Sequence, residues 1–289
     1  MRVALFVTCL ADHYFAAAAA DAVRLLRHLG CEVAFPADQT CCGQPAYNAG
    51  RLGEARRMAE HTLEVFAGAP GDPGDPAAPD APTAAEAVVL PSGSCATMVK
   101  KFYPRLLAGG ADTSGSVALA NRTSAAAALA DRTFDLAEFI VHRLGVTELG
   151  SGLAGRKVAV HQGCHALREL RLETEPAVLL EGAGAEVVSW EAQEECCGFG
   201  GLFSVKMSAV SAAMADRKLD TLPEVDWVVS GDGGCVLHLD GRNRARGTGI
   251  EFVHLATALW RGVAGGARAA EGSDVAATHA AAARPLEVP

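Results

Sequence analysis

The motif Cys-Cys-Gly occurs twice in this chain, within QTCCGQPAYN at Gln39–Asn48 and within EECCGFGGLF at Glu194–Phe203. A single cysteine precedes each copy, and the interval Cys9–Cys41 has the same length as the interval Cys164–Cys196. Equal spacing of an uncommon motif indicates an internal repeat. A repeat of this kind sets the architecture of the whole chain.

The sequences around the two motifs also match one another, in the same order. RVALFVTC at Arg2–Cys9 matches KVAVHQGC at Lys157–Cys164, so a short apolar run precedes each upstream cysteine. Three further pairs follow: LGCEVAFP (Leu29–Pro36) with AGAEVVSW (Ala183–Trp190), AVVLPSGSC (Ala87–Cys95) with DWVVSGDGGC (Asp226–Cys235), and RTFDLAEFIVHRLG (Arg132–Gly145) with IEFVHLATALWRG (Ile250–Gly262). The repeat predicts one cysteine-bearing domain at 1–150 and a second at 151–264.

Two segments fall outside the repeat, and both are predicted to be disordered. The tract GAPGDPGDPAAPDAPT has almost no apolar surface to bury, so we interpret about 68–84 as a disordered insertion. This insertion explains the longer distance from the cysteine pair to the next cysteine in the first half. The Ala-rich tail at 265–289 lacks apolar periodicity. The Ala-rich stretch Gly109–Asp131 is compatible with either a helix or an irregular segment.

Hydrophobic periodicity predicts that strands and helices alternate along each half. The predicted elements are strands at Val3–Val7, Cys31–Phe35, Glu86–Leu90 and Asp226–Ser230, and a helix at Ala17–Leu29 that ends at Gly30. Such alternation is typical of parallel βαβ units with helices on both faces. The predicted fold class is therefore α/β, with two pseudo-symmetric Rossmann-like parallel βαβ halves, each carrying a CCG motif. Ligands of such sheets bind beyond the carboxyl ends of the strands.

Eight of the nine cysteines recur in both halves and are the candidate ligands of a metal cofactor: Cys9, Cys41, Cys42 and Cys95 in the first half, and Cys164, Cys196, Cys197 and Cys235 in the second. The ninth, Cys31, aligns with Ala185, so we interpret it as a buried core residue. Four converging thiolates can hold a tetrahedral zinc ion or an iron–sulfur cluster.

The adjacency of two cysteines favours a cluster. Structural zinc sites usually separate paired cysteines by about two to four residues, so that both side chains reach one ion. Adjacent side chains diverge, which suits the several irons of a cluster. Gly43 and Gly198 fit a tight backbone turn against a bulky inorganic group. Two alternatives stay open: an inert buried pair beside a turn, and metal-free dithiol redox chemistry, for which the usual Cys-x-x-Cys is missing.

Composition and termini exclude several classes of function. The net charge is −9 and no basic stripe occurs, so nucleic acid is not an expected partner. The start, MRVALFVTCL, has no long apolar region or cleavage site, and no apolar run is long enough to span a bilayer. We therefore expect a cytoplasmic protein that is not an integral membrane protein. In that compartment patterned cysteines indicate metal or redox chemistry.

The sequence assigns no catalytic residue. The glycines of Gly231–Gly234 match neither the dinucleotide-binding nor the phosphate-loop pattern, and no Gly-x-Ser-x-Gly occurs. His161, His165 and His238 flank candidate ligands, and we interpret them as hydrogen-bonding or packing groups.

The paired motifs resemble those of the cysteine-rich CCG-domain family, which includes the CCG-bearing component of heterodisulfide reductase and the iron–sulfur component of glycolate oxidase. CCGQPAYNAG at Cys41–Gly50, PSGSCATMV at Pro91–Val99 and CCGFGGLFSVKM at Cys196–Met207 are similar to the lactate utilisation protein A group of that family. The resemblance covers about residues 1–262.

This resemblance implies one iron–sulfur cluster per half, of the 4Fe-4S type, held by the eight cysteines. It implies an electron-transfer component of a multi-protein complex that oxidises L-lactate, a 2-hydroxy acid, to pyruvate, rather than a complete enzyme. The expected partners are a ferredoxin-motif iron–sulfur protein and a third small protein. The heterodisulfide reductase relatives carry a fifth cysteine where this chain has Ser92 and Asp232, so Asp232 is a candidate extra oxygen ligand. The alternatives are a component of a cluster-based disulfide or thiol reductase and a zinc-stabilised scaffold.

Overall fold

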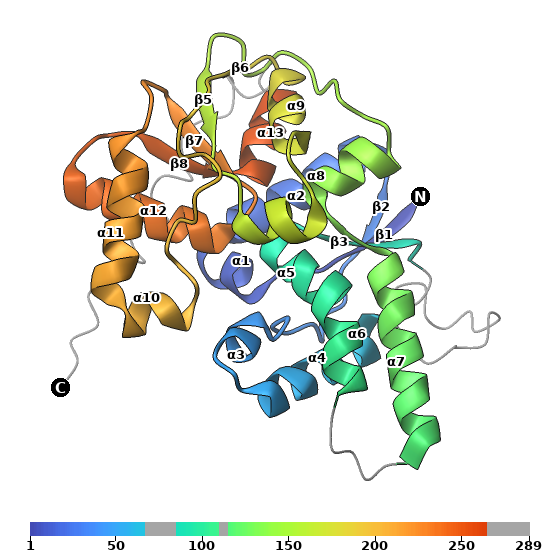
Figure 1. Ribbon diagram of the computed structural model, residues 1–289. Coiled ribbons are helices and arrows are strands. Elements are labelled where there is room, and N and C mark those ends of the chain that lie inside the picture. Colours follow the sequence, from blue (N-terminus) through green and yellow to red (C-terminus); the bar gives the residue numbers. More distant parts are fainter. Residues whose placement is uncertain (67–84, 110–114, 265–289) are drawn as a thin grey trace.

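The computed structural model describes residues 1–66, 85–109 and 115–264. Both segments predicted to be disordered, about 68–84 and 265–289, lie outside the described residues. Within the described residues, strands and helices alternate along the chain. The strands form two four-stranded sheets, one in each half of the sequence (Figure 1).

The first half contains four strands, and its last two strands are each followed by a helix that continues into a π-helical turn. Its elements are β1 (Arg2–Leu5), α1 (Cys9–Tyr14), α2 (Ala16–His28), β2 (Glu32–Ala34), α3 (Gln44–Asn48), α4 (Leu52–Phe66), β3 (Ala87–Leu90), α5 (Gly93–Thr97), η2 (Met98–Phe102), α6 (Tyr103–Ala108), α7 (Gly115–Asp131), β4 (Thr133–Asp135), α8 (Leu136–Glu138) and η3 (Phe139–Arg143).

The second half repeats this alternation with fewer helices. Its elements are β5 (Lys157–Val160), η4 (Ala166–Leu170), α9 (Glu175–Glu181), β6 (Glu186–Val187), α10 (Leu202–Lys206), α11 (Ser208–Asp220), β7 (Trp227–Ser230), α12 (Gly233–Arg246), β8 (Glu251–His254) and α13 (Leu255–Ala264).

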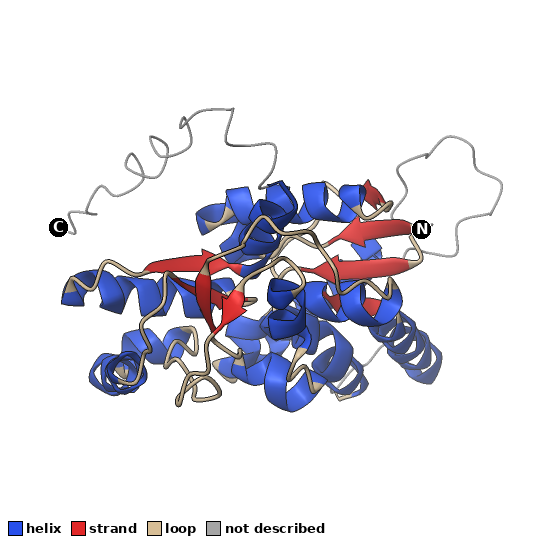
Figure 2. Ribbon diagram, turned by 90° about the horizontal axis from the view of Figure 1, so that it is seen from above, coloured by secondary structure: helices blue, strands red, loops and turns tan. Residues whose placement is uncertain are grey.

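Both sheets are parallel and have equivalent strand orders, β2-β1-β3-β4 and β6-β5-β7-β8. Val3 of β1 is in register with Val33 on one side and with Ala87 on the other. Val158 of β5 holds the equivalent place in the second sheet. Helices cover both faces of the strands (Figure 2). The predicted fold class, two parallel βαβ halves, is confirmed.

The predicted element bounds differ from the observed ones by a few residues. The first strand ends at Leu5 rather than Val7, whose backbone N–H donates to the side chain of Gln39 instead of to a neighbouring strand. Helix α2 ends at His28, one residue before the predicted end, and Gly30 follows the capping residue Leu29 with a φ of +82°. The Ala-rich stretch near Asp131 is helical, and it forms α7.

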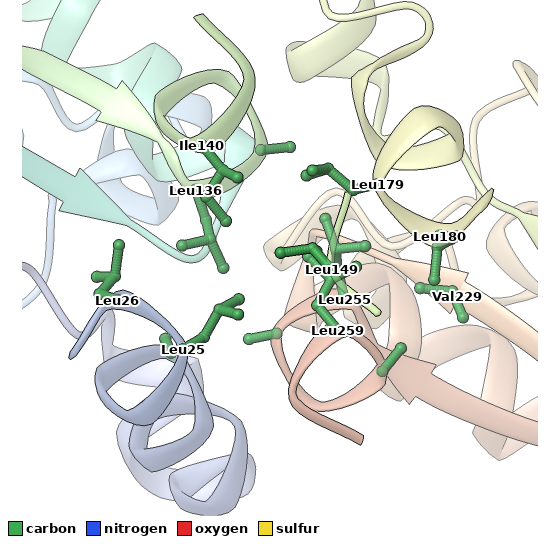
Figure 3. Packing of buried hydrophobic residues seen from close by; sticks show 14 of the residues in the cluster. Leu25, Leu26, Leu136, Ile140, Leu149, Leu179, Leu180, Val229, Leu255 and Leu259 are labelled. Atoms are coloured by element: carbon green, nitrogen blue, oxygen red, sulfur yellow. The ribbon is translucent and has the colours of Figure 1, made fainter. Parts of the chain in front are cut away.

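One hydrophobic core joins the two halves. Leu25 and Leu26 of α2, together with Leu136, meet Leu179 of α9 and Leu259 of α13 (Figure 3). All five side chains are at most 1% exposed. Burying a side chain of this size stabilises a fold by about 1.5–3 kcal/mol. The shared core therefore holds the two sheets, and the cysteines at their edges, in a defined relative position.

Two further observations concern expectations from the sequence. Cys31 belongs to this core and is 6% exposed, in agreement with a packing role. Among the helices in the described part of the chain, none combines the length and the hydropathy that crossing a membrane requires.

Candidate metal centres

The four recurring cysteines of the first half gather at the carboxyl edge of the first sheet. Cys9 begins α1 beyond β1, Cys95 lies in α5 beyond β3, and the adjacent pair lies in the loop between β2 and α3. The Sγ atoms of Cys9 and Cys41 are 3.5 Å apart, and those of Cys42 and Cys95 are 3.2 Å apart. Residues distant in the sequence thus form one group of four thiols.

The second half builds an equivalent group. The Sγ atoms of Cys197 and Cys235 are 3.2 Å apart, and the Cys164 thiol interacts with the Cys196 sulfur. All nine cysteines of the chain are free thiols. The structure therefore brings together the residues that the repeat had paired, while their role as iron ligands stays a prediction.

One sulfur in the first group is held as a thiolate by its neighbours. Hydrogen bonds from the thiols of Cys42 and Cys9 lower the pKa of Cys41 to about 3. The same hydrogen bonding to Cys41, together with burial, raises the pKa of Cys9 and of Cys42. The backbone N–H of Gly43 also donates to the Cys41 sulfur, at 3.4 Å.

The second group has the same pattern. Hydrogen bonds from Cys164 and Cys197 lower the pKa of Cys196 to about 2, and the N–H of Gly198 donates to its sulfur at 3.4 Å. A soft metal that takes all four sulfurs displaces the remaining thiol protons. The donor set of each group fits either an iron–sulfur cluster or a zinc ion, because thiolates bind both.

The glycine of each motif is required by the backbone. Gly43 has a φ of +84° and Gly198 a φ of +89°, a region that side chains disfavour. A Cβ added to Gly198 would lie 2.6 Å from the carbonyl oxygen of Ser211, and one added to Gly43 would lie 3.3 Å from that of Ala55. Each CCG loop therefore packs directly on the long helix that follows it, which fixes the direction of the adjacent cysteines.

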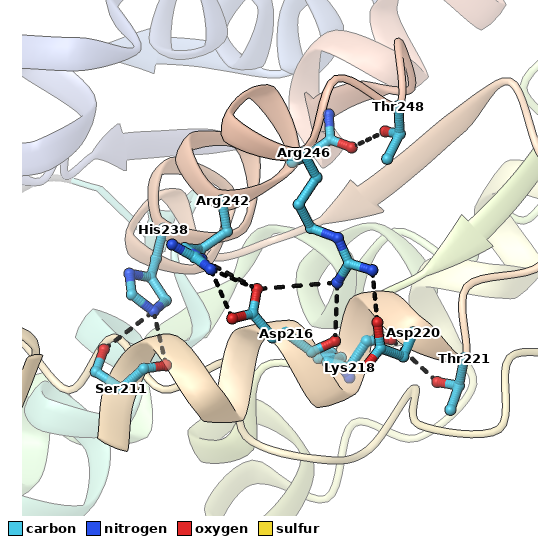
Figure 4. A network of polar contacts seen from close by, with 10 residues as sticks. Ser211, Asp216, Lys218, Asp220, Thr221, His238, Arg242, Arg246 and Thr248 are labelled. Carbon is cyan, nitrogen blue, oxygen red and sulfur yellow. Dashed lines mark hydrogen bonds and ion pairs between the residues drawn. The ribbon is translucent and has the colours of Figure 1, made fainter. Parts of the chain in front are cut away.

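Two of the three flanking histidines make local contacts. His238 Nε2 lies 3.1 Å from the hydroxyl of Ser211 (Figure 4). That hydroxyl donates to the carbonyl of Gly198 at 2.7 Å. His238 thus supports the second CCG loop from α12. His165 Nδ1 lies 3.6 Å from the sulfur of Cys164. Both contacts agree with the hydrogen-bonding role expected from the sequence.

The third histidine, His161, lies in the site itself. A ring nitrogen of His161 and the sulfurs of Cys197 and Cys235 all lie within 4.8 Å of one another, a spacing that could hold a metal ion. The sequence pattern around His161 predicts a packing or hydrogen-bonding group, and no pattern predicts that Lys218 is buried. Lys218 lies in an otherwise ordinary polar helix, so no sequence signal separates it from a surface lysine.

Asp232 connects the two halves between the cysteine groups. Its Oδ1 accepts hydrogen bonds from the Ser92 hydroxyl (3.0 Å), the Ser94 hydroxyl (2.6 Å) and the Ser94 backbone N–H (3.2 Å). All three donors belong to the first half, although Asp232 precedes α12 of the second. The other carboxylate oxygen of Asp232, Oδ2, lies close to Gly163. A Cβ added to Gly163 would be 2.5 Å from this oxygen. A role for Asp232 as an extra ligand stays a prediction.

We expect Asp232→Ala to lower the free energy of unfolding by about 1–3 kcal/mol, because the buried donors of Ser92 and Ser94 lose their acceptor. Urea denaturation of the full chain measures this. Ser94→Ala removes part of the same contact and should have a smaller effect. Unchanged stability in Asp232→Ala would contradict the linking role, and loss of iron at unchanged stability would identify Asp232 as a ligand instead.

Comparison with known families agrees with this arrangement. The model of the cysteine-rich domain, CCG, matches residues 3–100 and 158–240, one match in each half. The chain is thus a protein with two cysteine-rich CCG domains. Lactate utilization protein A of a Geobacillus species is 40% identical over 262 residues, which are 90% of this chain and 99% of that protein. The protein of the same name from Macrococcus caseolyticus is 42% identical over 258 residues, 88% of this chain and 94% of that protein. The chain belongs to the lactate utilization protein A family.

Proposed function

We propose that each half binds one iron–sulfur cluster of the 4Fe-4S type through its four cysteines, and that the protein is the electron-transfer component of a multi-protein complex that oxidises L-lactate to pyruvate. The grouping of four free thiols in each half carries the proposal, with Sγ separations of 3.2 Å in Cys42–Cys95 and in Cys197–Cys235. When bound, such clusters supply one-electron redox chemistry.

The sequence of the motif supports a cluster over a single zinc ion. Structural zinc sites usually separate paired cysteines by about two to four residues, whereas the cysteines of each pair here are adjacent, Cys41 with Cys42 and Cys196 with Cys197. The expected divergence of the adjacent side chains is not observed, because the thiols of Cys9 and Cys42 both donate to Cys41 and the sulfurs form one compact group. The argument for a cluster therefore depends on the adjacency of the cysteines in both halves and on the match to the cysteine-rich CCG domain.

The substrate class is proposed from the relatives, which carry the name lactate utilization protein A and match about nine-tenths of this chain. A protein that only transfers electrons needs partners that oxidise the 2-hydroxy acid and accept its electrons. We infer a ferredoxin-motif iron–sulfur protein and a third small protein. A cytoplasmic location is part of the proposal, because nine free thiols suit a reducing compartment.

Anaerobic purification with iron and sulfide assays tests the cofactor. We expect equal amounts of iron and acid-labile sulfide and an electron paramagnetic resonance (EPR) signal after reduction with dithionite. Zinc in place of iron, or no metal after reconstitution with iron and sulfide, would contradict the proposal and favour the zinc-stabilised scaffold.

The electron-transfer role requires the reconstituted complex. L-lactate added to the chain together with its two partners should bleach the cluster absorbance, whereas the chain alone should not respond. D-lactate and glycolate serve as substrate controls. Reduction of a disulfide substrate by the chain alone, with no response of the complex to lactate, would overturn the proposal in favour of a thiol or disulfide reductase.

A further inference from the structure

The two cysteine groups have similar sulfur arrangements but different surroundings. Phe6 follows β1 in the first half, and His161 occupies the equivalent position after β5 in the second. Phe6 stacks on Phe66, with ring centroids 4.7 Å apart, so this side of the first site is apolar.

A second difference lies on the helix behind each CCG loop. The would-be Cβ of Gly43 meets Met58 of α4, and that of Gly198 meets Met214 of α11, so the two methionines are equivalent. One helical turn later the first half has Thr62 and the second has Lys218. The Thr62 hydroxyl accepts a hydrogen bond from buried Tyr103, so an uncharged pair fills this position in the first half.

Lys218 places a buried positive charge behind the second site. Its side chain is fully buried, its Nζ donates to the carbonyl of Ala192, and the ammonium lies 4.2 Å from the ring centroid of Trp190. Burial lowers the pKa of Lys218 to about 8, and the nearby Cys197 acts in the opposite direction. The hydrogen bond to the Ala192 carbonyl and the position over the Trp190 ring are contacts that an ammonium group makes.

Two carboxylates lie near this site, and both are hydrogen-bonded by other groups. Glu195 is engaged by Arg217 through two hydrogen bonds of 2.9 Å, and Asp232, which faces Cys164, accepts from Ser92 and Ser94.

His161 adds a polar group directly against the sulfurs. It is 2% exposed, and apart from a weak contact with the backbone of Gln193 neither ring nitrogen has a hydrogen-bond partner among the described residues. An unpartnered buried polar group is costly, so the imidazole fits a ligand that it completes. Beside a cluster it can donate an N–H to a cysteine sulfur or bind an iron, and both stabilise the reduced state relative to an all-thiolate, apolar site.

We propose that Lys218 and His161 make the second cysteine site the higher-potential centre of the two, so that an electron shared between the halves resides in the second half. The inference rests on the proposed function, because it requires a cluster in each half. Reduction adds negative charge, which a buried ammonium stabilises and which Phe6 and Thr62 do not. One electron lost by the first centre is gained by the second, and no bond or proton changes place.

Redox titration of the full chain, monitored by EPR at set potentials, measures the midpoint potential of each cluster. Variants Cys42→Ala and Cys197→Ala, each keeping one cluster, assign the signals. We expect the second-half centre to be reduced first. In Lys218→Met, the ratio of electron occupancy of the second cluster to that of the first should fall about tenfold. This change corresponds to 59 mV for a one-electron couple. His161→Phe, which installs the residue of the first half, should shift this ratio in the same direction.

Lys157→Met is the matched control, because it removes an exposed lysine at the start of β5, at the opposite end of the sheet. The Lys157→Met variant should leave the midpoint potentials of both clusters unchanged. Should Lys218→Met fail to fold, Phe6→His tests the same idea from the other side, and it should raise the midpoint of the first centre.

The inference is overturned if the first-half centre is reduced first, or if Lys218→Met shifts the midpoints no more than Lys157→Met does. These outcomes differ from a failure of the proposed function, in which one or both halves hold no cluster and no pair of midpoints exists.

Discussion

Cys42→Ala is expected to remove about half of the iron and acid-labile sulfide from the protein, because a cluster that loses one of four thiolates is no longer held by its site. Cys42 is 1% exposed and its sulfur is 3.2 Å from that of Cys95, so no other donor replaces it from solvent. Cys197→Ala should have the same effect in the second half, where Cys197 contacts Cys235 at 3.2 Å. The double variant should hold no cluster.

Cys31→Ala is the matched control. Cys31 is also a buried cysteine of the first half, but it lies in the hydrophobic core shared by the two sheets. We expect this variant to keep its full iron content, with only the modest destabilisation that follows loss of a small core side chain. Loss of all iron from either single variant would contradict independent sites, and loss of iron from Cys31→Ala would contradict the assignment of the ligands.

Gly182→Ala is expected to destabilise the protein by about 3 kcal/mol or more, as overpacking against rigid backbone does at its upper range. A Cβ at this position would lie 1.7 Å from the carbonyl oxygen of Thr147. The obstacle is main chain and cannot rotate away. The same two segments are joined by a hydrogen bond of 2.7 Å from the Leu149 N–H to the Gly182 carbonyl. Separating them would draw the core residue Leu149 out of its place.

Gly241→Ala is the control for this prediction. Gly241 lies inside helix α12, its added Cβ would meet nothing within 4 Å, and the position is exposed. Alanine in a helix interior is favoured over glycine by about 1 kcal/mol, so this variant should be slightly more stable than the parent. Urea unfolding of both full-length variants measures the difference. Equal urea midpoints for Gly182→Ala and Gly241→Ala would contradict the close approach of Gly182 to the backbone of Thr147.

The fold was predictable because its signals are local. Short β-branched runs and the amphipathic helix before Gly30 are signals within short windows, and the Cys-Cys-Gly motif, itself three residues long, recurs at equal spacing in both halves. The strand bounds were less accurate at Val3–Val7, since the end of a strand depends on what its neighbours offer. There the side chain of Gln39 replaces a neighbouring strand as the acceptor of a backbone N–H.

The amino-acid sequence by itself determined the α/β class, the two halves and the grouping of the cysteines, because equal spacing in a repeated parallel fold brings equivalent residues to equivalent strand ends. Only the tertiary structure decided what surrounds each group. Asp232 reaches Ser92 and Ser94 across the junction of the halves, and Lys218 and His161 turn inward toward the second site alone. Which way a polar side chain faces depends on how helices pack on sheets distant in the sequence, and the desolvation that follows is absent from any local pattern.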